Sequence, residues 1–342
     1  METLGVSDIT PMQASVVFGL GLGLAFGVLA QTTEFCLRRA IAGIGHERSA
    51  ARGVWASALL SSLLGTQFLL AYAPLSLEEH RFLVADIPIV AIITGGLLFG
   101  VGMILTRGCV SRLTVLTGAG NLRALLVLVV FAVIAHATLK GVLAPLRVWL
   151  GSFSWTSPVG SSLVAWPGGT WLYTGVLGAM LLLVALRASA RKRALAGGIL
   201  LGLLVPLGWL GTGWLLLDEF DPLPLESLSF TLPHTQLAFW AMVSSAVPAG
   251  FGVGLIGGVV AGALLTALLR GQFQWQSFES PRQTARYMTG GSLMAVGGVL
   301  AGGCTVGAGL TGVATLSLAA ILALLAMLVG GMLMARLDTQ SS

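Results

Sequence analysis

The sequence contains very little charge. Only 9% of its 342 residues are Asp, Glu, Lys or Arg, whereas a soluble globular domain has about 25%. The 18 basic and 13 acidic side chains give a net charge of +5, but the basic ones stand in short segments between apolar runs and form no basic domain. The composition therefore excludes an ordinary soluble protein, and we expect no nucleic-acid partner.

Cysteine is also scarce. The chain has three cysteines, Cys36, Cys109 and Cys304, and no Cys-x-x-Cys pair. This spacing supports neither a disulfide framework nor a zinc site. We therefore expect no metal and no cofactor. Because all three cysteines lie beside apolar segments, the question they raise is whether a thiol acts inside a membrane.

Apolar residues and glycine are what the sequence has in abundance. Hydrophobic side chains make up 56% of the chain, the mean hydropathy is +0.93 and 47 residues are glycine. In so apolar a chain, this much glycine is typical of closely packed or broken membrane helices. We predict an all-α integral membrane protein with about nine transmembrane helices, at residues 14–31, 53–73, 88–106, 122–139, 170–187, 196–217, 249–269, 287–303 and 313–335.

The distribution of charge predicts the orientation of these spans. Arginines gather in alternate connections, around 38–52, 187–193 and 270–286, whereas the connections 78–86 and 218–226 are acidic. Positive loops stay on the cytoplasmic side of a membrane. We therefore expect a multi-pass protein of the cell inner (plasma) membrane, with its N-terminus outside and its C-terminus cytoplasmic.

An internal repeat organises the chain. The stretch Thr94–Cys109, TGGLLFGVGMILTRGC, matches Thr289–Cys304, TGGSLMAVGGVLAGGC, at nine of sixteen positions. The predicted orientation makes the two spans antiparallel, which is the signature of an inverted repeat with short re-entrant half-helices. We predict a first membrane half at 1–140, a connecting loop with two transmembrane helices at 141–234, and a second membrane half at 235–342.

A weaker similarity joins two other segments. Residues 18–22, FGLGL, resemble residues 251–255, FGVGL, which would make four related units, three of them ending in cysteine. In the third unit along the chain, the position that matches Cys36 falls near Leu269 and has no thiol. The predicted orientation makes these two segments parallel, so two interpretations stay open. Either 18–31 and 249–269 are true repeats and the short apolar piece at 235–247 alters the count of spans, or the match is chance in glycine-rich sequence.

The residues beside the cysteines favour a site for a polarised solute. Gly108 precedes Cys109 and Ser111 follows it, while Gly303 and Thr305 flank Cys304. A helix that breaks inside a membrane leaves backbone groups unpaired, and such a break persists only in a protein interior or along a polar path. A thiol is a weak donor and weak acceptor, which suits a sulfur-bearing ligand better than a hard oxyanion.

Each of these residues also has a plainer interpretation. A lone cysteine in an apolar segment is usually a small buried hydrophobe, although two cysteines at matched places in a repeat weaken that explanation. Cys36 stands at a polar edge, where both interpretations are open. Arg107 could attract an anion to the mouth of a path, or could be an arginine that extends to the membrane interface.

The cysteine segments resemble those of a known family. GVGMILTRGCVSRLTVLTGAGNLRALL, MAVGGVLAGGCTVGAGLTGVATLSLAA and TTEFCLRRA are similar to the signature segments of the YeeE/YedE membrane proteins, which transport sulfur compounds. The resemblance implies a bundle with short half-helices at a narrow waist, and a thiosulfate ion passed between Cys36, Cys109 and Cys304. It also implies a small cytoplasmic sulfur carrier, of the TusA or rhodanese type, as a partner beside the lipid bilayer.

Two functions are compared on these grounds. The first is transport of thiosulfate or a related sulfur-containing anion along a thiol-lined central path. The second is a membrane thiol redox or sulfurtransferase protein that acts on a partner's persulfide. A thiol oxidant normally needs a closely spaced cysteine pair, and the three cysteines here are far apart in sequence. We therefore expect a transporter rather than an enzyme, although distant thiols could still meet in space.

Overall fold

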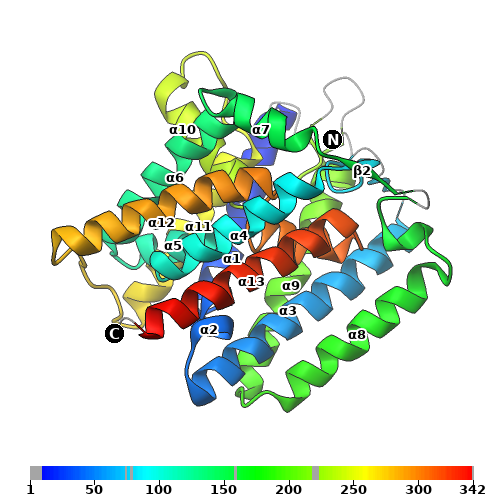
Figure 1. The fold of residues 1–342 in the computed structure, drawn as a ribbon, viewed down its shortest axis with the longest axis horizontal. Coiled ribbons are helices and arrows are strands. Elements are labelled where there is room, and N and C mark those ends of the chain that lie inside the picture. Colours follow the sequence, from blue (N-terminus) through cyan, green and yellow to red (C-terminus); the bar gives the residue numbers. More distant parts are fainter. Residues whose placement is uncertain (1–9, 74, 78–79, 158–159, 218–222, 341–342) are drawn as a thin grey trace.

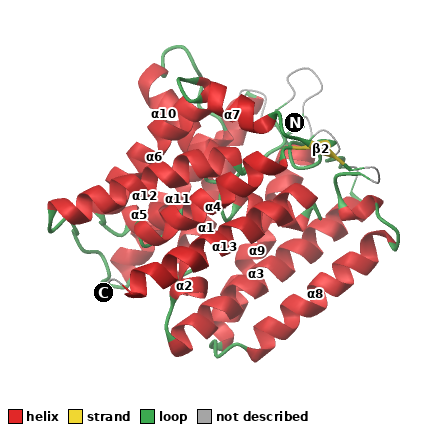
Figure 2. Ribbon diagram, in the orientation of Figure 1, coloured by secondary structure: helices red, strands yellow, loops and turns green. Residues whose placement is uncertain are grey.

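The protein is a bundle of helices with almost no sheet (Figure 2). The computed structural model describes residues 10–73, 75–77, 80–157, 160–217 and 223–340. The helices are α1 (Pro11–Thr33), α2 (Leu37–Ala42), α3 (Gly45–Tyr72), α4 (Ile89–Leu105), α5 (Val110–Gly118), α6 (Leu122–Lys140), α7 (Ala144–Gly151), η2 (Leu163–Ala165), α8 (Gly169–Arg187), α9 (Lys192–Leu210), η3 (Gly211–Leu215), α10 (Thr231–Val243), α11 (Phe251–Leu269), α12 (Pro281–Leu300), η4 (Gly307–Gly312) and α13 (Leu318–Gln340). Strands β1 (Asp86–Ile87) and β2 (Trp155–Thr156) pair antiparallel.

Eight helical segments among the described residues are long and apolar enough to cross a membrane. They confirm an all-α multi-pass membrane protein. The span expected at 287–303 is present as α12, which has 20 residues but is not among the eight. Its first turns carry Arg282 and Arg286, so the start of α12 is polar.

One expected boundary is wrong. The last span was expected at 313–335, but α13 begins at Leu318. Residues 307–312 form the π-helical segment η4, which is followed by a turn in which Leu316 adopts a positive φ of 58°. The glycines and threonines after Cys304 therefore form a re-entrant segment rather than the start of a transmembrane helix.

Helices α4 and α12 pack closely and run antiparallel (Figure 1). A Cβ atom built on Gly102 would lie 2.4 Å from the carbonyl oxygen of Gly290, and one on Gly297 would lie 2.5 Å from the carbonyl oxygen of Gly95. As the residue number rises along α4, the number of the residue contacted on α12 falls, so the two helices run in opposite directions. Since the repeat equates Gly95 with Gly290 and Gly102 with Gly297, the two contacts are related by a pseudo-twofold axis, as an inverted repeat predicts.

Helices α1 and α11 pack just as closely but run parallel. A Cβ atom on Gly19 would lie 2.4 Å from the Phe251 oxygen, and one on Gly27 would lie 2.3 Å from the Val259 oxygen. Here the residue numbers of the contacts rise together along α1 and α11, so the two helices run in the same direction. The segments at 18–31 and 249–269 are therefore neighbours in the bundle without being an inverted pair.

The edge of the bundle differs from its centre. Helix α8 lies at the periphery beside α3 (Figure 1), and only Thr174, Gly178 and Ala185 of α8 are buried. Most of its other apolar side chains are exposed, which is the pattern of a helix that faces lipid. The buried core instead surrounds the broken helices α4, α5, α12 and η4.

We predict that the α4–α12 contact tolerates no added methyl group. Gly297→Ala should lower the free energy of unfolding by about 1–3 kcal/mol, because its Cβ would overlap the α4 backbone. Gly257→Ala is the matched control, since a Cβ there meets nothing within 4 Å. Thermal unfolding in detergent, followed by intrinsic fluorescence, measures both. Equal midpoints for the two variants would contradict this packing.

Candidate functional site

All three cysteines follow the same kind of helix break. Two residues before each cysteine, the backbone adopts the left-handed conformation, at Glu34 (φ 52°), Arg107 (φ 58°) and Gly302 (φ 74°). This conformation ends a helix by turning the chain back on its last carbonyl groups. The amide of Gly108, for example, donates to the Met103 carbonyl at 3.1 Å. The repeat therefore conserves a backbone turn, even where an arginine occupies the position that glycine takes in the other copy.

Each cysteine also lies at or near the start of the next helical segment. Cys36 is the N-cap residue of α2 and Cys109 that of α5. Cys304 precedes η4, and its Sγ accepts a hydrogen bond from the Gly307 amide at 3.3 Å. Backbone amides at a helix start carry partial positive charge, so the breaks direct amide dipoles as well as thiols toward one region.

A fourth break completes the pattern without a thiol. Helix α11 ends before Gly271, which has a φ of 62°, and the Gln272 amide donates to the Ala267 carbonyl at 2.8 Å. The position two residues after the left-handed residue is Phe273. The position that matches Cys36 is therefore Phe273 and not Leu269. Leu269 is still the last residue of α11, whereas Cys36 comes two residues after the left-handed residue of its break.

The breaks bring the three thiols together from different parts of the chain. The Cys36 and Cys109 thiols are close enough to interact with each other, and Cys304 is close enough to Cys109 for the two to interact electrostatically. Their exposed fractions are 3%, 2% and 0%. We call these residues the cysteine cluster, with Cys109 as its middle member.

Hydroxyl groups line the cysteine cluster. Ser111 Oγ lies 3.2 Å from Cys109 Sγ, and the Thr305 hydroxyl also lies close to that thiol. Among the described residues, the buried hydroxyls of Thr305, Ser229 and Thr231 have no well-aligned hydrogen-bond partner. Ser229 and Thr231 flank Phe230, whose backbone contacts Cys304. A buried polar group without a partner is costly, so these hydroxyls are candidates for binding a solute.

The predicted site residues divide into two sets. Gly108, Ser111, Gly303 and Thr305 are buried at the breaks beside the thiols, as expected from sequence. Arg107 differs, because its side chain is exposed and forms no ion pair within the described ranges. Its exposed position agrees with the interpretation of Arg107 as an arginine that extends to the membrane interface, away from the core.

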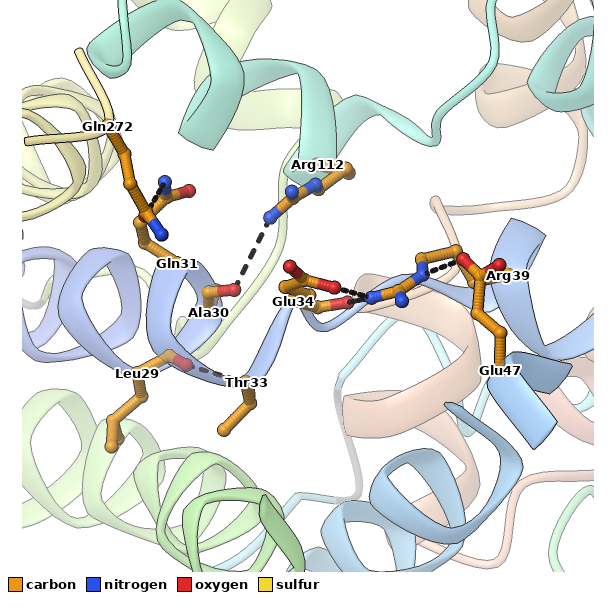
Figure 3. Close-up of polar contacts among 9 residues, drawn as sticks. All are labelled: Leu29, Ala30, Gln31, Thr33, Glu34, Arg39, Glu47, Arg112 and Gln272. Atoms are coloured by element: carbon orange, nitrogen blue, oxygen red, sulfur yellow. Dashed lines mark hydrogen bonds and ion pairs between the residues drawn. The ribbon is translucent and has the colours of Figure 1, made fainter. Parts of the chain in front are cut away.

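Arg112, rather than Arg107, lies beside the thiols. It lies close to Cys36, and its Nη1 donates to the Ala30 carbonyl at 3.4 Å, at the last turn of α1 (Figure 3). On the far side of the same break, Arg39 bridges two carboxylates, contacting Glu34 and donating to Glu47 at 2.7 Å (Figure 3). This polar network holds the turn that carries Cys36.

A cavity of about 720 Å³ lies near Cys304. Its wall includes Gly307 and Thr311 of η4, together with His80, Arg81 and Glu226 from connections between helices. The wall also includes Phe82, Trp209, Thr212 and Ser229. Because η4 begins three residues after Cys304, the cavity reaches the Cys304 end of the cysteine cluster.

Burial perturbs the charged groups of the cavity. Desolvation, reinforced by the charge of Arg81, lowers the pKa of His80 to about 4, so His80 is neutral near pH 7. Burial lowers the pKa of Arg81 below its ordinary value and raises the pKa of Glu226 above its ordinary value. Arg81 nevertheless remains the cation that lines this cavity, since guanidinium groups stay charged in proteins.

The cavity and the arginine-rich connections lie at opposite ends of the bundle. Helix α3 begins at Gly45, next to Arg48, and ends just before Leu75, which lines the cavity. Helix α9 likewise begins at Lys192 and ends beside Trp209. We call these the arginine end and the cavity end. Within the described part of the chain, no group of three or more His, Cys, Asp or Glu side chains could hold a metal ion.

Comparison with known proteins assigns the chain to a class. A family model described as sulphur transport matches residues 32–333, which is nearly the whole chain and includes all three cysteines. A search of curated proteins found no match.

We predict that mild oxidation links Cys36 to Cys109. Diamide would accept the two thiol hydrogens as the disulfide forms, and these two thiols are the pair in the cysteine cluster that interact most strongly. Mass spectrometry of unreduced peptides would identify the pair, with Cys304 left free for alkylation. The variant Cys304→Ser should form the same link. Recovery of Cys36 paired with Cys304 instead would show that the cluster is arranged differently.

Proposed function

Because this chain belongs to the YeeE/YedE sulphur transport family, we propose that it carries thiosulfate, or a closely related sulfur-containing anion, through the cysteine cluster. The observation that supports this most directly is the meeting of three buried thiols from three separate helix breaks. Membership of the family supports sulfur-compound transport in a multi-pass membrane protein. The identity of the anion and its route are the proposal.

The proposed route has three steps. The anion enters the cavity, which reaches η4 beside Cys304. It then passes from Cys304 to Cys109, where the Thr305 and Ser111 hydroxyls supply further donors. It leaves past Cys36 toward Arg112 and the arginine end. Each step replaces one set of weak donors with another, so no single position binds the ion strongly enough to hold it.

The chemistry of the lining suits thiosulfate. Moving an anion into a low-dielectric interior is costly unless hydrogen bonds replace its water. Thiols are weak donors and polarisable acceptors, which matches a terminal sulfur, and the hydroxyls match the sulfonate oxygens. Arg81 and Arg112 stand near the two ends of the cysteine cluster. Positive charge at the ends favours entry of an anion, while its absence in between avoids a deep trap.

Orientation follows from the distribution of charge. We propose that the arginine end faces the cytoplasm of the inner membrane and the cavity end faces outward, since positive loops remain on the cytoplasmic side. The N-terminus then lies outside and the C-terminus inside. A cytoplasmic sulfur carrier of the TusA or rhodanese type would receive the anion at the arginine end.

One observation favours a second function. The Cys36 and Cys109 thiols are 73 positions apart in sequence but close enough to interact in the fold. A thiol redox or sulfurtransferase protein needs such a pair. Both thiols are buried, however, so a protein partner could not reach them without a rearrangement, whereas a small anion could.

We predict that thiosulfate uptake into liposomes depends on each thiol. Cys36→Ser, Cys109→Ser and Cys304→Ser should each slow the initial uptake of radiolabelled thiosulfate about tenfold or more, which corresponds to about 1.4 kcal/mol of barrier. Gly257→Ser is the matched control, because it adds the same hydroxyl where no neighbour lies within 4 Å.

Two outcomes would contradict the proposal. Uptake at the parent rate in all three cysteine variants would remove the thiol route. No uptake by the parent protein, together with transfer of sulfur to an added acceptor protein, would favour the second function.

A further inference from the structure

Arg81 is a cation in the wall of the cavity. The side chain of Arg81 is exposed to the cavity, and its guanidinium carbon lies 5.1 Å from the centre of the Phe82 ring. No carboxylate among the described residues forms an ion pair with it. Arg81 is therefore a charged side chain that faces the cavity without a carboxylate of the described residues in contact, and a guanidinium placed in this way is available to bind an anion.

Other uncommitted donors line the same space. Trp209 is 1% exposed and lines the cavity, and its indole Nε1 has no hydrogen-bond partner among the described residues. The buried hydroxyl of Ser229 is also unpaired and also lines the cavity. A guanidinium, an indole N–H and a hydroxyl are all groups that donate to an oxyanion.

Glu226 lines the same cavity as these donors. Its backbone is fixed by Thr212, whose Oγ1 donates to the Glu226 carbonyl at 2.7 Å and accepts from the Glu226 amide at 3.1 Å. One carboxylate oxygen accepts from Gln236 Nε2 at 3.3 Å. Glu226 therefore has a defined position on the cavity wall, close enough to Arg81 for the two charges to interact without contact.

We propose that the cavity is an oxyanion-binding site in which Arg81 holds the anion and Glu226 limits its affinity. Trp209 and Ser229 complete the set of donors. Arg81 is also close enough to Cys304 to interact with it electrostatically. An anion held by Arg81 through its oxygens can therefore present its other end to that thiol. This orientation rests on the proposed function, whereas binding of the anion does not.

The two charged residues have opposite effects in this site. Arg81 supplies charge-assisted, bidentate hydrogen bonds, which are the strongest that a protein offers to an oxyanion. Glu226 repels the same anion through a short stretch of protein. A site that contains both residues binds the anion weakly enough to release it toward Cys304. The cavity can then act as an entry site rather than as a site of tight binding.

Equilibrium binding tests this proposal independently of transport. The full chain in lipid nanodiscs is titrated with radiolabelled thiosulfate, and unlabelled sulfate is added as a competitor. Arg81→Gln should raise the dissociation constant about tenfold or more, and Arg81→Lys should recover part of the loss. Glu226→Gln should lower the dissociation constant roughly three- to fivefold. Lys140→Gln is the matched control, because Lys140 is exposed and does not line the cavity.

The outcomes separate this inference from the proposed function. Sulfate should compete with thiosulfate, because Arg81 binds the anion through its oxygen atoms. Cys304→Ser should retain binding even if it loses uptake. Equal dissociation constants for the parent, Arg81→Gln and Lys140→Gln would overturn the oxyanion site, whatever the uptake results. Loss of binding in Arg81→Gln, with normal uptake in every cysteine variant, would support the site and contradict the thiol route.

Discussion

The structure depends on how a helix can break inside a membrane. Hydrocarbon offers no hydrogen bonds, so the backbone groups freed at a break must find partners within the protein. Here each break uses a left-handed residue and a short following segment, and each is buried against other helices. The close approach of α4 and α12 through Gly95, Gly102, Gly290 and Gly297 packs the two copies of the repeat against each other. The segments that follow their breaks contribute Cys109 and Cys304 to the cysteine cluster.

Burial and charge then divide the site into regions. The centre contains thiols, hydroxyls and backbone amides, while the arginines lie near its ends. This arrangement follows from the cost of burying charge, because a fixed cation at the waist would either be neutralised or bind an anion too tightly. Glu34, Arg39 and Glu47 show the alternative at the arginine end, where charges neutralise one another (Figure 3).

The residues that sequence reasoning missed are informative. Arg81 and Glu226 come from two connections whose composition suggested only that they were acidic loops, and Ser229 and Thr231 belong to no motif. Nothing in their local sequence predicts that these connections fold over the same cavity. Arg107 was a reasonable candidate by its position before Cys109, but a single turn of backbone directs its side chain outward. Arg112, five residues later, lies beside Cys36 instead.

The sequence by itself determined the class of the protein, most of its spans, the antiparallel repeat and the three cysteine breaks. These features follow from composition, run length and local similarity, which depend on neighbours in the chain. Only the tertiary structure decided that Cys36 meets Cys109, that Phe273 occupies the fourth slot, and that Arg81 and Glu226 share a cavity near Cys304. Such contacts join residues that are distant in sequence. They depend on how glycine-lined helices pack against one another, and no local pattern encodes that packing.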